Sequence, residues 1–141
     1  MGRGNDSIAI FLDASFLYAY MNDADIHHGK ALKIFQELAE NKYGETVTSD
    51  YIFDEAVTVT SRKAGRQTAI NLGNFILNSE IVLIKISNLL IEKSWELFQK
   101  TDGLSFTDCT NISLMQTFRI NNIATFDKSF SQIEGIIVIG Q

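Results

Sequence analysis

Four acidic residues could act together in one site: Asp13, Glu55, Asp108 and Asp127. Two of them follow apolar runs that look like strands, because residues 8–12 precede Asp13 and residues 123–126 precede Asp127. Open α/β sheets bind ligands at the carboxyl ends of their strands. Two charges about 6 Å apart repel by about 3 kcal/mol at an effective dielectric of about 20, so such a cluster needs protons or a cation. Oxygen ligands suit Mg²⁺ or Mn²⁺, and either ion could activate a water and polarise a phosphoryl oxygen.

Three of these carboxylates also have an ordinary structural explanation. Asp13 could cap a helix that begins at residue 14, and Asp127 could belong to a turn. Asp108 stands three residues after Ser105, which is the spacing of a capping box. Both explanations stay open at each position, and convergence of all four residues in space would favour the functional one.

Glu55 has a competitor in its neighbour Asp54. Successive helical residues differ by about 100° around the axis, so at most one of the two faces a cleft. Glu55 adjoins Ala56 beside the apolar stripe of the predicted helix, so we expect Asp54 to point to solvent. Both residues could also serve only as acidic groups near a helix N-terminus.

Hydroxyl and basic side chains accompany the carboxylates. Ser15 stands two residues after Asp13 and could bind a phosphate or orient a water, and Thr107 directly precedes Asp108. The densest basic stretch contains Arg62, Lys63 and Arg66. These side chains could contact RNA phosphates, or they could form only a solvated helix end.

Other reactive or aromatic side chains have simpler expected roles. His27 and His28 have no Cys or His partner at metal-ligand spacing, so we expect both at the surface and no zinc site. We expect Cys109 to be a buried helix residue. Trp95 and Phe98 are expected to belong to the core-facing stripe of a helix.

The elements that must position these residues alternate between strand and helix. The predicted strands are residues 8–12, 45–49, 81–86, 123–126 and 135–139. Four predicted helices span residues 14–22, 27–41, 66–78 and 105–120. Two more are predicted from their ends: one is capped by Asp50 and broken by Gly65, and the other is capped by Ser87 or Asn88. This alternation predicts βαβ units with right-handed crossovers, and therefore an α/β fold with a parallel sheet covered on both faces.

Length and composition place limits on the protein class. The 141 residues suffice for one domain, and we expect a flexible lead over residues 1–7 and a single domain over residues 8–141. A formal charge of −5 argues against coating nucleic acid by charge, but not against an acidic metal site that acts on it. The single cysteine excludes an intrachain disulfide and favours a reducing, cytoplasmic setting. No apolar run approaches about 20 residues, so we expect no contact with a membrane.

Short motifs along the chain resemble those of PIN-domain ribonucleases, in particular the VapC-type toxins. They are Phe11-Leu-Asp-Ala-Ser-Phe-Leu17, Asp54-Glu55, Leu104-Ser-Phe-Thr-Asp-Cys109 and Thr125-Phe-Asp127, and the similarity spans residues 8–139. The resemblance implies a three-layer α/β/α sandwich with a central, mainly parallel sheet. It also implies a catalytic site made of Asp13, Glu55, Asp108 and Asp127, with Ser15 and Thr107 at accessory hydroxyl positions.

The same resemblance implies an activity and partners. The reaction would be metal-dependent hydrolysis of RNA phosphodiester bonds, in tRNA or rRNA. Asp13, Asp108 and Asp127 would hold Mg²⁺ or Mn²⁺, and Glu55 would help to bind metal or position the attacking water. The protein would form a homodimer and be silenced by a small antitoxin protein that covers a groove beside the site. Cys109 stands where many relatives have Ala, a difference that affects packing rather than chemistry.

Two other enzyme classes with a similar sheet lack a required residue here. A phosphatase of the haloacid dehalogenase type needs a second Asp two residues after the first, where this chain has Ser15. A response-regulator receiver needs an Asp at the end of its third strand, and residues 85–88 contain none. The remaining alternative is a PIN-like RNA-binding or protein-interaction module without activity, and the presence of all four acidic positions argues against it.

Overall fold

A five-stranded parallel sheet forms the middle of the molecule. The computed structural model describes residues 8–140, so the predicted lead at residues 1–7 lies outside the described residues. The strands are β1 (Ala9–Leu12), β2 (Glu45–Ser49), β3 (Val82–Ile84), β4 (Asn122–Ala124) and β5 (Ile137–Ile139). They lie in the order β3-β2-β1-β4-β5, and every neighbouring pair is parallel.

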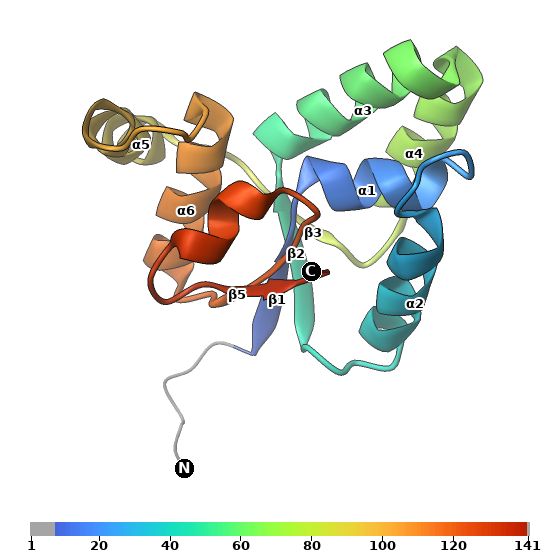
Figure 1. Cartoon of the computed structure of the whole chain (residues 1–141), viewed down its shortest axis with the longest axis horizontal. Helices are drawn as coiled ribbons and strands as arrows, with labels where there is room; N and C mark the ends of the chain where they lie inside the picture. The colour runs from blue at the N-terminus through green and yellow to red at the C-terminus, as the bar shows by residue number, and fades with distance from the viewer. Residues whose placement is uncertain (1–7, 141) are drawn as a thin grey trace.

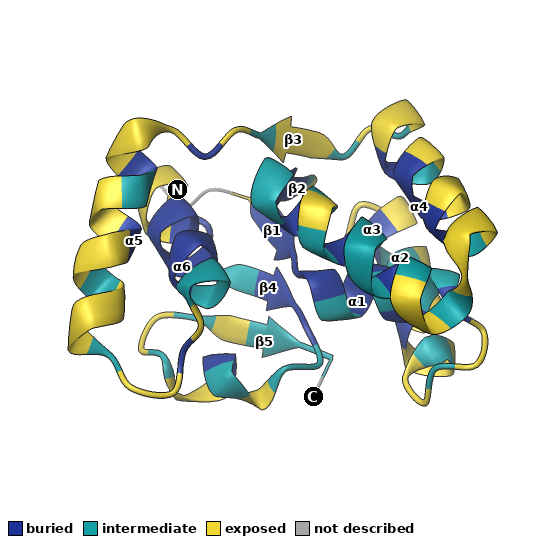
Figure 2. Ribbon diagram, turned by 90° about the horizontal axis from the view of Figure 1, so that it is seen from above, coloured by how far each residue is buried: buried dark blue, intermediate teal, exposed yellow. Residues whose placement is uncertain are grey.

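Helices cover both faces of this sheet. One face carries α1 (Ala14–Met21), α2 (His28–Ala39), α3 (Asp50–Ala64) and α4 (Arg66–Asn78), at the right of Figure 1. The other carries α5 (Asn88–Lys100) and α6 (Phe106–Phe118), and the view from above separates the two layers (Figure 2). A 3₁₀ helix, η1 (Lys128–Gln132), joins β4 to β5. The predicted three-layer α/β/α sandwich is confirmed.

The strand order creates a crevice between β1 and β4. From β1 the chain builds outward through β2 to β3, and it then returns to the other side of β1 for β4 and β5. Ligands of open α/β sheets bind where the strand order reverses in this way, at the carboxyl ends of the strands. Residues that directly follow β1 and β4 therefore flank the most favourable binding position of the fold.

The central position of β1 explains its composition. Ile10, Phe11 and Leu12 are completely buried, because β2 and β4 lie on both sides and helices cover both faces. A strand buried on both faces needs apolar residues at every position, which is why this run lacks the alternation of a half-exposed strand.

Hydroxyl side chains fix the starts of three helices. The Ser49 Oγ accepts a hydrogen bond from the Ile52 N–H at 3.1 Å, so Ser49 caps α3 and the prediction that Asp50 does so was wrong. The Asp50 carboxylate instead accepts from the Ile86 N–H at 2.9 Å and ties the start of α3 to the segment after β3. Ser87 caps α5, one of the two predicted possibilities, and Ser105 caps α6.

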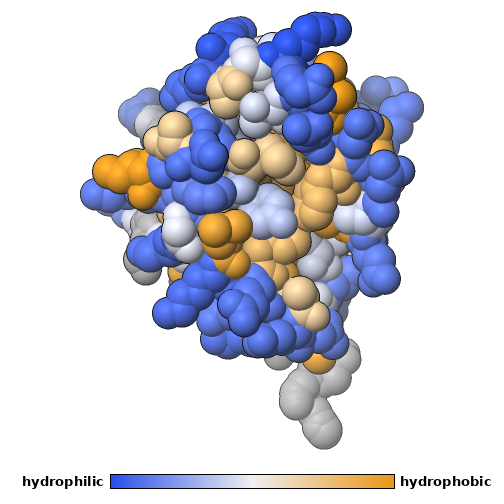
Figure 3. All heavy atoms as spheres, turned by 90° about the vertical axis from the view of Figure 1, so that its right-hand side faces the viewer, coloured by the Kyte–Doolittle hydropathy of each residue, from blue (hydrophilic) through white to orange (hydrophobic). Residues whose placement is uncertain are grey.

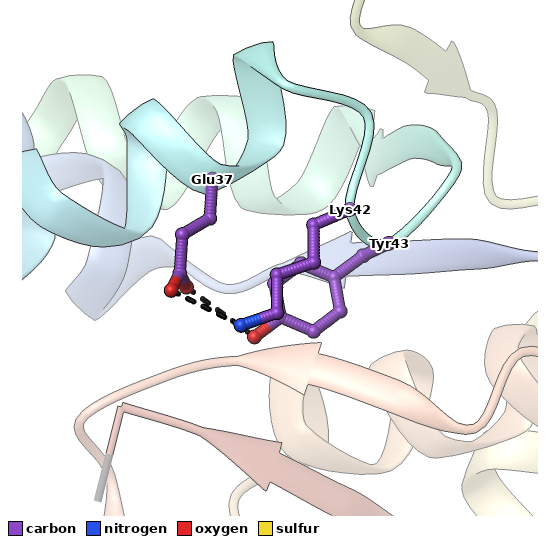
Figure 4. A network of polar contacts seen from close by, with 3 residues as sticks. All are labelled: Glu37, Lys42 and Tyr43. Atoms are coloured by element: carbon purple, nitrogen blue, oxygen red, sulfur yellow. Dashed lines mark hydrogen bonds and ion pairs between the residues drawn. The ribbon is translucent and has the colours of Figure 1, made fainter.

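The turn between α2 and β2 is closed by a polar contact and a glycine. The Lys42 Nζ and the Tyr43 hydroxyl both donate to the Glu37 carboxylate, at 3.2 and 3.3 Å (Figure 4). This contact with Glu37 raises the pKa of Lys42. Gly44 has a φ of 80°, and a Cβ there would lie 2.2 Å from the Ile8 carbonyl oxygen. Only glycine fits such a position without strain.

Apolar side chains are also visible at the surface. The face that carries α2 and α4 has apolar atoms toward its centre, surrounded by hydrophilic ones (Figure 3). A hollow of about 430 Å³ lies beside the amino end of β2 and is lined by Phe35, Leu38 and Ile81, among others. It contains none of the predicted site residues and lies at the opposite end of the strands from them. No helix among residues 8–140 combines the length and the apolar character that crossing a membrane requires.

Two expectations for aromatic side chains need correction. Trp95 is 54% exposed and Phe98 is 37% exposed, so they do not belong to the core. The buried line of α5 runs through Leu90 and Ser94, and Trp95 lies about 100° away from it around the helix. His28 was expected at the surface but is only half-exposed, because its Nδ1 is hydrogen-bonded with the Ala19 carbonyl oxygen at 2.8 Å.

Candidate active site

Asp13 is buried at the crevice between β1 and β4. It occupies the N-cap position of α1, yet its side chain makes no capping hydrogen bond. Instead, the Asn111 Nδ2 donates to one carboxylate oxygen at 3.1 Å, and the Thr125 hydroxyl donates to the other at 2.7 Å. The carboxylate is thus held by α6 and by the end of β4, and helix capping does not explain its position.

The environment of Asp13 disfavours its ionised form. The pKa of Asp13 is raised to about 6: burial is the largest cause, the hydrogen bond from Thr125 opposes the rise, and the charges of Asp108 and Glu55 add to it. Removing a carboxylate from water costs free energy that two neutral donors recover only in part. A cation bound nearby would reverse this balance.

Glu55 lies on α3 and faces the same pocket. It is half-buried, whereas Asp54 is exposed and lies within 3.5 Å of the Thr58 hydroxyl, so the predicted choice of Glu55 agrees with the structure. Burial raises the pKa of Glu55, and the charges of Asp108 and Asp127 add to the effect. A contact with the Thr107 side chain acts in the opposite direction. Thr107 therefore lies where an accessory hydroxyl was predicted.

Asp108 has both of the roles that its position allows. It closes a capping box, since its N–H donates to the Ser105 Oγ and its own Oδ2 accepts from the Ser105 N–H, each at 3.0 Å. It also faces the other carboxylates. Burial raises the pKa of Asp108, and the charge of Asp127 contributes. The cap fixes the carboxylate in the first turn of α6 and so directs it toward the crevice.

Asp127 lies half-buried after β4 and shapes the start of η1. Its Oδ1 accepts from the Ser129 N–H at 2.9 Å and from the Ser129 hydroxyl. Its own N–H donates to the Thr125 Oγ1 at 3.0 Å. The turn explanation is therefore correct, but the charge of Asp127 also acts on Glu55 and Asp108.

Thr125 connects the polar groups of the crevice. Its single hydroxyl proton is donated to Asp13, so the 3.1 Å contact with the Ser15 Oγ requires Ser15 to be the donor. The Ser15 Oγ in turn accepts from the Phe126 N–H at 3.0 Å. Ser15 thus supports the crevice through Thr125, in the accessory position that was predicted.

Two residues of the site were not recognised in the sequence. The sequence shows Thr125 only as part of the Thr125-Phe-Asp127 motif and gives no signal for Asn111. Asn111 lies three residues after Asp108 on α6, a spacing that places the two on the same side of a helix. Thr125 precedes Asp127 by two residues. The Asn111 Oδ1 is buried and has no hydrogen-bond partner within residues 8–140.

The predicted basic residues separate into two groups. Arg62 borders a hollow that also contains Glu55 and Thr107, and Lys63 borders one that contains Glu55 and Asp127. Both are exposed, and neither forms an ion pair within the part of the chain that the structure describes. Arg66 instead lines a hollow between α3 and α4 that contains none of the acidic site residues, so the structure does not bring it to the site.

The site fits a hydrated divalent cation in its donor chemistry and in its charge. All four acidic side chains offer oxygen, the donor that Mg²⁺ and Mn²⁺ prefer, and among residues 8–140 none of them forms an ion pair. Among residues 8–140, no three His, Cys, Asp or Glu side chains form a ready metal cage. Mg²⁺ commonly keeps several waters and binds through one or two carboxylates, so a closed cage is not needed.

Comparison with known proteins identifies the family. The PIN domain family model matches residues 10–136. The chain belongs to the PIN domain family. It is 29% identical over 124 residues to the 23S rRNA-specific endonuclease VapC20 of Mycobacterium tuberculosis, covering 86% of this chain and 92% of that protein. It is 22% identical over 127 residues to a VapC ribonuclease of Archaeoglobus fulgidus, covering 88% of this chain and 80% of that protein.

A solved structure supports the same relationship. The crystal structure of Mycobacterium tuberculosis VapC20, described as a sarcin–ricin loop cleaving toxin, matches with a TM-score of 0.79 and 28% identity. The match covers 86% of this PIN domain and 92% of that chain. The predicted resemblance to VapC-type toxins is confirmed, and the ribonuclease interpretation is favoured over the module without activity.

Proposed function

We propose that this PIN domain hydrolyses RNA phosphodiester bonds with the help of Mg²⁺ or Mn²⁺. Asp13, Asp108 and Asp127 would hold the ion, which when bound supplies charge neutralisation and a more acidic water. One observation carries the proposal: four acidic residues from distant parts of the chain share the crevice between β1 and β4, where burial and neighbouring carboxylate charges raise the pKa values of Asp13, Glu55 and Asp108.

Glu55 is the residue that we assign to proton transfer. It is half-buried beside the other carboxylates, and burial raises its pKa, which makes its carboxylate a stronger base. The contact with Thr107 restrains its side chain. One Glu55 carboxylate oxygen would accept a proton from the attacking water, while Asn111 and Thr125 keep Asp13 in place.

The substrate that we propose is ribosomal RNA, with tRNA as the alternative. The name of VapC20 specifies 23S rRNA, and the description of its crystal structure specifies the sarcin–ricin loop. Because that similarity covers most of both chains, the stem-loop RNA of the sarcin–ricin loop is the most informative first substrate. Arg62 and Lys63 flank the carboxylates and are free to contact its phosphates.

We also propose the biological setting of a toxin–antitoxin pair. The protein would act in the cytoplasm as a homodimer and be silenced by a small antitoxin, as its relationship to the VapC toxins suggests. Expression should slow the growth of a host cell, and a co-expressed antitoxin should relieve the effect. Growth that is unaffected by an active wild-type nuclease would contradict the toxin role without contradicting the enzyme activity.

The activity is tested with purified protein and the stem-loop RNA. We expect cleavage at one phosphodiester bond with Mg²⁺ or Mn²⁺, no cleavage in EDTA, and loss of cleavage in Glu55→Gln. The matched control is Asp54→Asn, which changes an exposed carboxylate one position away and should leave the rate unchanged. Equal rates for wild type and Glu55→Gln would overturn the assignment of Glu55, and cleavage that persists in EDTA would overturn the metal dependence.

A further inference from the structure

A hollow of about 300 Å³ adjoins the carboxylates and is not used by the chemistry described above. Its wall includes Ser15, Glu55 and Asp127 of the site, together with Tyr18, His27 and Lys63. Its volume lies at the lower end of the range for small-molecule pockets, which begins at about 300 Å³. Because three residues belong to both places, a group in the hollow lies directly beside a phosphate held at the carboxylates.

A column of aromatic rings leads from the core to the rim of this hollow. Phe16 is buried, and its ring centroid lies 6.3 Å from that of Phe126. The Phe126 ring stacks on that of His27, with centroids 4.4 Å apart and planes inclined by 5°. His27 is exposed and makes no second ring contact within residues 8–140, so one face of its ring can accept another flat group.

Tyr18 and Lys63 also line the hollow. The Asn22 Nδ2 donates to the Tyr18 hydroxyl at 3.1 Å and fixes the ring. The Lys63 Nζ lies 5.4 Å from the centre of that ring, within the range of a cation–π contact. Since Lys63 has no ion pair among the described residues, its charge remains available to a phosphate.

The loop that carries His27 is fixed before any ligand binds. The Asp25 carboxylate accepts from the His27 N–H at 2.7 Å, and the Asn22 side chain accepts from the Ala24 N–H at 3.1 Å. The His28 ring is hydrogen-bonded with the Ala19 carbonyl oxygen at 2.8 Å. A wall that is already ordered loses little conformational entropy on binding, which favours a built recognition site over a chance depression.

We propose that this hollow binds the base of the RNA nucleotide next to the cleaved phosphate, extruded from its stack and placed on the His27 ring. The inference rests on the proposed ribonuclease activity and adds to it the element that selects the cleavage position. Unpaired bases in loops are recognised by stacking on aromatic side chains and by hydrogen bonds to their edges. The carboxylates Asp25 and Asp127 in the wall disfavour a second phosphate and suit the amino groups of a base. Lys63 would hold the neighbouring phosphate.

The test compares intact and abasic versions of the stem-loop RNA of the cleavage assay. After the cleaved bond is mapped, the base on either side of it is removed in turn. His27→Ala should lower kcat/KM for intact RNA by about 5- to 150-fold, the range for losing one base–aromatic stack. On the RNA without the docked base, the same variant should have no further effect. His27→Phe keeps a flat ring and should retain most of the activity.

Binding supplies a second readout that does not need cleavage. With Asp13→Asn in the background, His27→Ala should weaken the Kd for intact RNA by a similar factor and leave the Kd for the abasic RNA unchanged. Trp95→Ala is the matched control, because it removes an exposed aromatic ring on the other face of the sheet and should change neither value.

The outcomes separate this inference from the proposed activity. Equal losses for His27→Ala on intact and abasic RNA, or no loss on either, would overturn the docking of a base on His27. Absence of cleavage of any RNA by the wild type would overturn the proposed function and the inference with it, whereas wild-type cleavage together with equal losses on intact and abasic RNA would overturn the inference alone. Thermal unfolding of each variant checks that the hollow is intact.

Discussion

Replacing Asp13 with Asn should make the metal-free protein more stable while it abolishes RNA cleavage. Asp13 is 5% exposed, and burial raises its pKa from 3.8 to about 6. That difference corresponds to about 3 kcal/mol between the two protonation states. An uncharged Asn of the same shape avoids this cost, but it keeps only one of the two hydrogen bonds that Asn111 and Thr125 donate. One lost hydrogen bond offsets about 1 kcal/mol, so we expect a net gain of about 2 kcal/mol.

The pH dependence gives the prediction its sign. Below about pH 4, Asp13 is protonated in both the folded and the unfolded chain, so its burial does not lower the free energy of unfolding. Between about pH 4 and pH 6 the unfolded chain ionises Asp13 while the folded chain still holds its proton, so the wild type loses up to about 3 kcal/mol of unfolding free energy, and the loss is complete above about pH 6. The variant lacks this loss, so its advantage should be present at about pH 8 and absent at about pH 4.

Urea unfolding in EDTA, followed by circular dichroism, measures the difference. The variant should have the higher midpoint at the higher pH, and Mn²⁺ should stabilise the wild type but not the variant. Asp54→Asn is the control, because this exposed carboxylate should alter stability little at either pH. A variant that is less stable than the wild type at the higher pH would refute the reasoning, since the buried charge would then already be compensated within the fold.

Three further predictions concern the support of the site and the fold. Thr125→Val removes the hydroxyl that lowers the pKa of Asp13, so that pKa should rise. As the pH is lowered, the cleavage rate of the variant should therefore begin to fall at a higher pH than that of the wild type; an unchanged pH profile would contradict this. Gly44→Ala places a Cβ 2.2 Å from the Ile8 carbonyl oxygen at a φ of 80°, and urea unfolding should show a loss of at least about 1 kcal/mol. Ser49→Ala removes the cap of α3 and should lower the unfolding free energy by about 1 kcal/mol, with the cleavage rate of the folded protein retained; a lost rate at full stability would assign Ser49 to the site instead.

The sequence was sufficient to predict the arrangement of strands and helices. The unbroken apolar run of β1 is typical of a strand buried on both faces, and the structure places that strand at the centre of the sheet. Boundaries were less accurate. The fourth strand ends at Ala124 rather than at Phe126. The Thr125 N–H still donates to the Ile139 carbonyl oxygen at 3.1 Å, but the Phe126 N–H donates to the Ser15 Oγ instead of to a neighbouring strand.

Predictions failed where they depended on the direction of a side chain. Trp95 was expected on the core-facing stripe of a helix, but the narrow buried line of α5 passes through Leu90 and Ser94. Asn111 was missed for the opposite reason. A neutral amide on a helix carries no signature of its own, and only the three-dimensional structure brings it to Asp13, 98 residues earlier in the chain.

Mn²⁺ located directly in a crystal would test the central claim, that carboxylates from four separate segments form one metal-dependent centre. Crystals soaked in Mn²⁺ should show anomalous density in the crevice between β1 and β4, within ligand distance of Asp13 and of Asp108 or Asp127. Asp13→Asn crystals treated in the same way should show less density there or none. Density only at other acidic groups of the surface, with the crevice empty in the wild type, would contradict the account.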